Sequence, residues 1–234
     1  MRATGRQLFP RVLLAAGLWL AAAQPSHADY PERAITLIVP FAPGGSTDVI
    51  ARTVAEALRP LLGQPVVVDN RAGAGGALGT AQIAKARPDG YTIGMGTAST
   101  LAINPAVYKS LPFDVTTDLA PVGAIAAVPN IMSVNPKVAA RNMSEFVPLA
   151  RIQAGRMSYG SSGNGSVSHL MGEQFKLATG ADLIHVPYRG IGPALNDAVA
   201  GQIEVLFDNL PTTLPLVQAG KLRALAISGP ARLP

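Results

Sequence analysis

Short apolar runs alternate with longer amphipathic stretches along most of this 234-residue chain, and this alternation constrains its fold more than any other feature. Residues 34–41 form an apolar run that predicts a buried strand. A glycine turn follows, and residues 46–62 then repeat apolar side chains at helical spacing, with Ser46 or Thr47 as the expected N-cap and Gly63 as the expected end. The same order of strand, turn and helix recurs along the chain, which is typical of an α/β architecture with parallel strands.

The predicted elements divide into two lobes with a crossing near residue 127. Residues 29–126 are expected to begin a first lobe and residues 127–221 to form a second, with a strand at 222–227 that brings residues 222–234 back to the first. Because the sequence ends at Pro234, we expect the first lobe to be incomplete. The further predicted strands are residues 66–69, 91–96, 122–126, 131–134, 157–159, 182–186 and 204–207, and the further predicted helices are residues 76–86, 144–153, 166–179 and 192–200.

The first 28 residues have the composition of a secretory signal sequence. Arg2, Arg6 and Arg11 precede an apolar run at residues 12–23, and the small residues near Ala28 suit cleavage after it. The run is shorter than the roughly 20 apolar residues that a membrane-spanning helix needs, so cleavage is favoured over an uncleaved anchor, which stays the alternative. We therefore expect a periplasmic protein.

Charge and composition exclude several classes of function. Cleavage after residue 28 removes three arginines and no acidic residue, so the net charge falls from +5 to +2. The remaining basic residues are scattered, whereas a nucleic-acid-binding protein concentrates them on one face. The sequence contains no cysteine and only three histidines, which excludes thiolate chemistry and leaves no usual cluster of metal ligands. We expect no cofactor, no metal ion and no nucleic-acid partner.

Two glycine-rich segments predict an anion-binding site. Residues 41–48 (FAPGGSTD) and residues 159–169 (YGSSGNGSVSH) each lead from a predicted strand into a predicted helix. A helix N-terminus has unpaired N–H groups and the positive end of the helix dipole, which together favour anions. Open α/β sheets also bind ligands at the carboxyl ends of their strands. Either segment alone is equally compatible with an ordinary turn, but their occurrence in both lobes favours a shared site.

Six sequence blocks occur in a fixed order: FAPGGSTD at 41–48, NRAGAGG at 70–76, PDGY at 88–91, SSGNG at 161–165, HVPYRG at 185–190 and FDN at 207–209. Together they closely resemble the Bug-type solute-binding proteins of tripartite tricarboxylate transporters. The resemblance implies a type II periplasmic-binding-protein fold, with a ligand cleft between two lobes. It also implies capture of a small carboxylate, such as an organic acid, an acidic amino acid or an aromatic acid, and delivery to the permease subunits of the transporter. We expect the protein to be a monomer.

The resemblance also assigns ligand-binding residues in both glycine-rich segments. Matched position by position, the carboxylate-binding residues are Phe41, Gly44, Gly45, Ser46, Thr47 and Asp48 in the first segment, Ser162, Gly163, Asn164, Ser166 and His169 in the second, and Asp208. Thr97 and Ser99 are added because they follow a predicted strand, and Tyr188 and Arg189 are candidates for contact with a second carboxylate of the ligand.

Three of these residues have a structural alternative. The carboxylate of Asp48 would repel an anionic ligand directly, so Asp48 is also predicted to hold its own loop. His169 lies one turn into its helix, where a histidine is more often a packing residue. Arg189 is equally compatible with a solvated loop charge.

A nucleotide-dependent enzyme is the alternative from another functional class. Residues 73–79 (GAGGALG) follow a predicted strand. A dinucleotide fingerprint, however, needs its third glycine where Leu78 stands, and an acidic residue where Thr97 and Ala98 stand. The sequence also lacks a nucleophile elbow, a zinc-binding histidine pair and a Walker lysine. We therefore predict a protein that is not an enzyme. A sensor that presents its ligand to a signalling partner would use the same cleft and stays open.

Overall fold

The computed structural model describes residues 30–229, so the predicted signal sequence at residues 1–28 lies outside the described residues. From Arg33 onward the described chain belongs to one compact unit. It contains two separate sheets, one of three strands and one of five. We call each sheet with its own helices a lobe.

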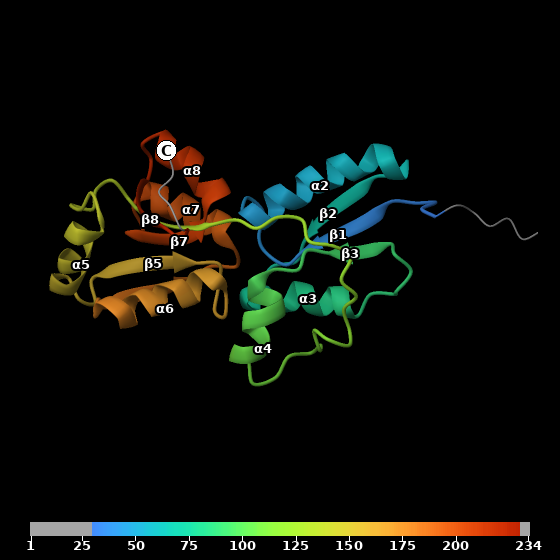
Figure 1. Ribbon diagram of the computed structural model, residues 1–234, viewed down its shortest axis with the longest axis horizontal. Coiled ribbons are helices and arrows are strands. Elements are labelled where there is room, and N and C mark those ends of the chain that lie inside the picture. Colours follow the sequence, from blue (N-terminus) through green and yellow to red (C-terminus); the bar gives the residue numbers. More distant parts are fainter. Residues whose placement is uncertain (1–29, 230–234) are drawn as a thin grey trace, which may run out of the picture. The chain divides into compact units, whose positions relative to one another are not determined.

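The first lobe is built on three parallel strands in the order β2-β1-β3. Helices α2 and α3 lie on opposite faces of this sheet (Figure 1). The apolar side chains of Leu37 and Val39 pack against Ala51 and Ala55 of α2, as the alternation of strand and helix predicts. The elements are β1 (Ile35–Val39), α2 (Ser46–Leu62), β2 (Val66–Asn70), η1 (Ala74–Gly76), α3 (Ala77–Ala84), β3 (Thr92–Gly94), the π-helical turn η2 (Ser99–Ile103) and α4 (Asn104–Val107).

The second lobe is built on five strands in the order β6-β5-β7-β4-β8. Strands β6, β5 and β7 are parallel, and β4 runs antiparallel to both β7 and β8. Helices α5 and α6 cover one face of this sheet and α7 and α8 cover the other (Figure 1). The elements are β4 (Asn130–Val134), α5 (Met143–Ile152), β5 (Met157–Ser161), α6 (Val167–Thr179), β6 (Leu183–Pro187), α7 (Ile191–Ala200), β7 (Val205–Asn209), α8 (Leu210–Gln218) and β8 (Arg223–Ile227).

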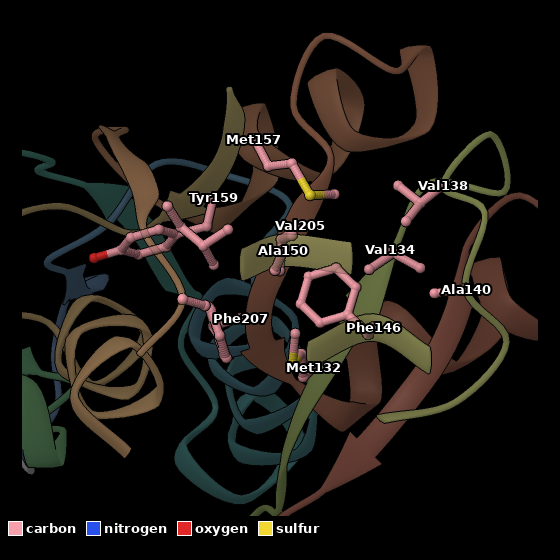
Figure 2. Close-up of a cluster of buried hydrophobic side chains, with 12 residues drawn as sticks. Met132, Val134, Val138, Ala140, Phe146, Ala150, Met157, Tyr159, Val205 and Phe207 are labelled. Carbon is pink, nitrogen blue, oxygen red and sulfur yellow. The ribbon is translucent and has the colours of Figure 1, made fainter. Parts of the chain in front are cut away.

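The largest apolar cluster lies under α5 and α6 in the second lobe. Phe146 and Tyr159 are fully buried there, and Phe207 meets Tyr159 edge-on with the ring centroids 5.6 Å apart (Figure 2). The Tyr159 hydroxyl points away from the rest of the cluster (Figure 2). Burial of each such side chain contributes about 1.5–3 kcal/mol of hydrophobic stabilisation, so this cluster is a rigid support for the strands beside it.

Three details of the sequence prediction are wrong. Residues 122–126 form no strand: the segment is extended and exposed, with Val122 94% accessible, because no neighbouring strand among residues 30–229 supplies hydrogen bonds to it. The strand at 223–227 pairs with β4 in the second lobe and does not join the first sheet, because the short turn after α8 returns the chain beside β4. Helix α2 has Gly45 as its N-cap in place of Ser46 or Thr47. Its predicted end is confirmed, since Gly63 adopts the left-handed conformation there.

Candidate functional site

The two glycine-rich segments lie where the sequence predicts, at the carboxyl ends of parallel strands. Residues 41–48, which we call loop A, connect β1 to the start of α2. Residues 160–168, which we call loop B, connect β5 to the start of α6. Each loop therefore brings a helix N-terminus to the end of its sheet where α/β proteins bind ligands.

Loop A is held by the buried carboxylate of Asp48. This carboxylate accepts hydrogen bonds from Gly44 N (3.0 Å), Arg52 Nε (3.1 Å) and Asn70 Nδ2 (2.9 Å). Burial alone would raise the pKa of Asp48, but the hydrogen bonds from Arg52, Gly44 and Asn70 outweigh it and lower the pKa. The same Asn70 amide donates to the carbonyl of Phe41 at 3.0 Å, so both ends of the loop are fixed. These contacts support the interpretation that Asp48 holds its loop.

The N–H groups at the start of α2 are not bound by other groups of the described chain. Within residues 30–229, no protein acceptor is found for the N–H groups of Ser46, Thr47 and Asp48. They are the first three residues of a 17-residue helix, where intrahelical acceptors are lacking. The Ser46 hydroxyl accepts a hydrogen bond from Asn209 Nδ2 of the second lobe at 2.6 Å. An anion at this position would meet three donors and the positive end of the helix dipole.

Loop B, in contrast, satisfies most of its N–H groups internally. Gly163 N donates to Ser161 Oγ (3.1 Å), and Ser162 N donates to Ser168 Oγ (2.9 Å). The N-cap is Ser166, whose hydroxyl accepts from His169 N at 3.2 Å. The serine hydroxyls of loop B therefore accept hydrogen bonds from N–H groups that a ligand would otherwise bind.

The first lobe supplies a further partner to loop B. Val167 N, at the start of α6, donates to Ser99 Oγ at 3.0 Å. Thr97 contacts Thr100 through N (3.0 Å) and Oγ1 (3.3 Å) and so helps to shape the turn that carries Ser99. Asn164 is exposed at the tip of loop B, and its carbonyl accepts from Tyr108 OH at 2.9 Å.

A stack of three rings backs loop B. The rings of His169 and His185 stack at 4.3 Å, and those of His185 and Tyr159 stack at 4.8 Å between centroids. His169 Nδ1 accepts from Gly165 N at 3.3 Å, and His185 Nε2 lies 2.6 Å from Ser161 Oγ. Burial, followed by the neighbouring His169, lowers the pKa of His185 to about 4, and burial lowers the pKa of His169 as well. His169 thus packs and also supports the loop.

Two predicted site residues are turned toward their own lobe. Tyr188 OH donates to Asp197 Oδ2 at 2.6 Å, and burial together with this bond raises the pKa of Tyr188. Asp208 is buried at the end of β7, where it accepts from Thr212 Oγ1 (2.7 Å) and Thr213 Oγ1 (2.6 Å). Burial raises its pKa despite these bonds. The structure therefore places Ser99 against loop B, whereas the side chains of Tyr188 and Asp208 bond within their own lobe.

The lobes meet through backbone at several glycines. A Cβ atom on Gly75 would lie 2.1 Å from the carbonyl oxygen of Asn164, and one on Gly163 would lie 3.3 Å from Gly75 N. Ala42 N donates to the carbonyl of Arg189 at 3.2 Å. We call this contact between the lobes the seam.

Sequence reasoning missed one polar residue at the seam. Asn104 is fully buried and donates from Nδ2 to the carbonyl of Gly75 at 3.3 Å, and within residues 30–229 no hydrogen-bond partner is found for its Oδ1. It lies beside loop B, since a Cβ on Gly165 would come within 3.1 Å of that oxygen. The only sequence signal was a polar residue before Pro105 in a predicted connector.

The described residues show neither a metal centre nor a membrane span. Within residues 30–229, no group of three or more His, Asp or Glu side chains is placed to hold a metal ion. In the same part of the chain, every helix is too short or too polar to cross a bilayer.

Comparisons with known proteins give consistent matches. Residues 50–234 match the family model described as the tripartite tricarboxylate transporter family receptor, TctC. Protein BugT of Bordetella pertussis is 42% identical over 222 residues, which cover 93% of this chain and 68% of BugT. The other curated relatives that match over most of this chain are longer as well, and the match spans between 61% and 66% of their length.

Solved structures of similar proteins include a periplasmic transporter with 55% identity and a TM-score of 0.85, covering 87% of this chain and 68% of that chain. An R. palustris protein with adipate has 40% identity and a TM-score of 0.84, with the same coverage. MatC from Rhodopseudomonas palustris, with bound malate, has 31% identity and a TM-score of 0.83, covering 87% of this chain and 69% of that chain.

Proposed function

This chain belongs to the TctC family of tripartite tricarboxylate transporter receptors and has the fold of periplasmic binding proteins, and from that premise we propose that it captures a small carboxylate between loops A and B. The observation that carries the proposal is the set of unpaired N–H groups of Ser46, Thr47 and Asp48 at the start of α2. Structural neighbours that contain adipate and malate support a carboxylate as the ligand class.

The electrostatics of one helix end are too weak to account for binding alone. A helix dipole contributes about 0.3–1 kcal/mol to an anion at its N-terminus, and up to roughly 2 kcal/mol when partly buried. Micromolar affinity corresponds to about −8 kcal/mol. The second lobe must therefore add contacts, and the exposed Asn164 and the hydroxyl of Ser162 are the groups of loop B that we assign to this role. The other predicted residues of both loops shape the site around the ligand.

The proposal includes a role in transport. We propose that the protein is secreted through its N-terminal signal sequence, binds the carboxylate in the periplasm as a monomer, and delivers it to the permease subunits of a tripartite tricarboxylate-type transporter. Family membership supports this role. Mass spectrometry of protein recovered from the periplasm should give a chain that begins at Asp29; a chain that retains residues 1–28 would contradict cleavage there.

The test of the anion site uses two substitutions at one position. Ser46→Pro removes the Ser46 N–H and the hydroxyl, whereas Ser46→Ala removes only the hydroxyl. Proline suits the first position of a helix, and the extended conformation of Gly45 (φ −89°, ψ 168°) is compatible with a following proline. We expect Ser46→Pro to bind adipate or malate at least tenfold more weakly than Ser46→Ala, by about 1.4 kcal/mol in calorimetry. Equal affinities of the two variants would exclude this N–H as a ligand donor.

A second experiment tests the absence of catalysis. A bound carboxylate recovered after denaturation of the protein should be chemically unchanged, and EDTA should have no effect on its binding. A modified product would place the protein among the enzymes.

A further inference from the structure

A groove of about 590 Å³ lies outside loops A and B, and both lobes contribute to it. Arg189, a candidate for contact with a second carboxylate, is the one predicted ligand-binding residue in its lining, and no lining residue is acidic. Three of its side chains are cationic: Arg71 after β2, Lys85 at the end of α3, and Arg189 after β6. Leu78 and Ala81 of α3 and Pro112 supply an apolar floor, and Leu78 is 55% exposed.

The cations of the groove are incompletely neutralised. Arg71 forms an ion pair with Asp69 at 2.8 Å, whereas no ion pair is found for Lys85 or Arg189 within residues 30–229. Both of these side chains belong to exposed residues. The groove therefore has positive charges to which an anionic partner can bind.

The groove also depends on contact between the lobes. Arg189 is its one lining residue from the second lobe. The carbonyl of Arg189 accepts from Ala42 N at 3.2 Å, and a Cβ on the next residue, Gly190, would lie 2.6 Å from the same nitrogen. Separation of the lobes would break this contact and remove Arg189 from the groove.

We propose that this groove docks an acidic segment of a protein partner, one that carries an apolar side chain among its carboxylates, and that docking selects the arrangement in which the lobes are in contact. An exposed ion pair contributes about 0–1 kcal/mol, so a small free anion on an open groove would gain little. A peptide segment adds contact with Leu78 and Pro112. The inference rests on the proposed function in one respect, that the lobes open and close around a ligand.

Other occupants fit the charge less well. Residues 1–29 carry three arginines and one aspartate, and residues 230–234 carry one arginine, so neither end of this sequence is acidic. A second copy of the chain has a net positive charge of +5 before cleavage of a signal and is repelled overall. Charge complementarity therefore favours an acidic segment of another protein.

The first test measures binding of a fluorescein-labelled peptide of repeating Glu-Glu-Leu to the full chain by anisotropy. Lys85→Gln and Arg189→Gln should each weaken binding about two- to fivefold. Arg156→Gln, which removes an exposed charge outside the groove, is the matched control and should leave binding unchanged. An unchanged affinity in Arg189→Gln would overturn the proposal, and so would citrate that competes as well as the peptide does, because it would indicate a site for small anions.

The second test separates the lobes without substituting a residue that lines the groove. A Cβ at position 192 would lie 2.2 Å from the carbonyl oxygen of Pro43, so Gly192→Val forces loop A away from the start of α7. This variant should weaken peptide binding at least as much as Arg189→Gln does. If circular dichroism shows that it does not fold, Gly190→Ala, with contacts of 2.6 Å and 3.0 Å to Ala42, replaces it. Unchanged peptide affinity in a folded variant would overturn selection of the closed arrangement. Carboxylate binding, measured separately by calorimetry, shows whether the proposed function fails while the groove still binds.

Discussion

Loops A and B are both rich in glycine and serine and occupy equivalent positions in their lobes. They differ in whether the N–H groups at the start of the following helix have protein acceptors. The start of α2 has three N–H groups without a protein acceptor among the described residues, and the side chain of Asp48, in the first turn of the helix, holds the loop. At the start of α6, Val167 N and His169 N are bound by the hydroxyls of Ser99 and Ser166. Loop A is therefore the stronger candidate for direct anion contact, and loop B is a pre-formed surface that the first lobe completes. A glycine-rich turn before a helix does not by itself show whether the N–H groups of the helix are unpaired or bound by other groups of the protein.

The largest expected effect comes from glycine substitution in loop B. Gly163 has φ of +115°, and a Cβ there would lie 2.9 Å from the carbonyl oxygen of Tyr188. Gly163→Val should lower the free energy of unfolding by about 3 kcal/mol, through backbone strain and this backbone contact. Gly45→Val, at φ −89° and against the flexible side chain of Ile191, should cost less than half as much. Urea denaturation measures both, and equal losses would contradict the difference between the loops.

The next effect tests how loop A is held. Asp48→Asn removes the charge that accepts from Gly44, Arg52 and Asn70, and should destabilise the protein by about 2 kcal/mol, as loss of charge-assisted hydrogen bonds typically does. Hydrogen exchange should show faster exchange of Gly44 N–H than in the wild type, with loop B unchanged. Glu56→Gln, on the exposed side of the same helix, is the control. Equal protection of Gly44 in the Asp48→Asn variant would contradict the role of Asp48.

A smaller effect tests the bonds between the lobes. Ser99→Ala leaves the part-buried Val167 N without its acceptor and should cost about 1 kcal/mol, because a backbone N–H fixed at the start of a helix cannot turn toward another partner. Ser46→Ala removes the acceptor of Asn209 Nδ2, which is also part-buried, and should cost about half as much, because a side-chain amide can turn toward another partner. Thermal denaturation distinguishes them, since 1 kcal/mol corresponds to roughly 2–4 °C for a chain of this size. A larger loss of stability in Ser46→Ala than in Ser99→Ala would contradict the expected order.

The smallest expected effect is a pH dependence of stability, which arises from the His185 ring behind loop B. The pKa of His185 is lowered to about 4 in the folded state, from about 6.5 in an unfolded chain. The unfolded state therefore binds more protons between these values, so stability falls as the pH is lowered from about 6.5 to about 4. The ring is partly exposed and solvent screens it, so we expect about 1 kcal/mol rather than the full value of the shift.

The matched variant for this pH dependence is His185→Gln, which retains a hydrogen-bonding group near Ser161 but does not titrate. Its stability should vary less between pH 4 and pH 6.5 than that of the wild type. The ordinary pKa of Asp48 already lies below pH 4, and the folded state lowers it further. Loop A should therefore add nothing to the change in stability between pH 4 and pH 6.5. An unchanged dependence of stability on pH in His185→Gln would exclude His185 as its source.

Most of the local structure follows from local sequence. The apolar run before Pro40, the helical spacing after Gly45 and the glycine at position 63 are sufficient to predict β1, α2 and the end of that helix. The same holds for β5 and α6, which lie close to the predicted strand at 157–159 and helix at 166–179. Both candidate loops could therefore be located from the sequence.

The contacts that distinguish the loops could not be predicted in this way. Ser99 and Val167 are 68 positions apart, and Asn209 and Ser46 are 163 positions apart. No periodicity or composition reports such pairs. The apolar run at residues 122–126 failed as a predicted strand for the same reason, because strand formation depends on a neighbour that is distant in sequence.

The seam is formed largely by main chain, with Gly75 and Gly192 in contact with carbonyl groups of the opposite lobe. Contact of this kind immobilises few side-chain rotamers, so bringing the lobes together costs little rotamer entropy, and parting them recovers little. A ligand whose affinity differs between open and closed states by a few kcal/mol is then sufficient to shift the population from one to the other. A seam of long interdigitated side chains would require a larger difference.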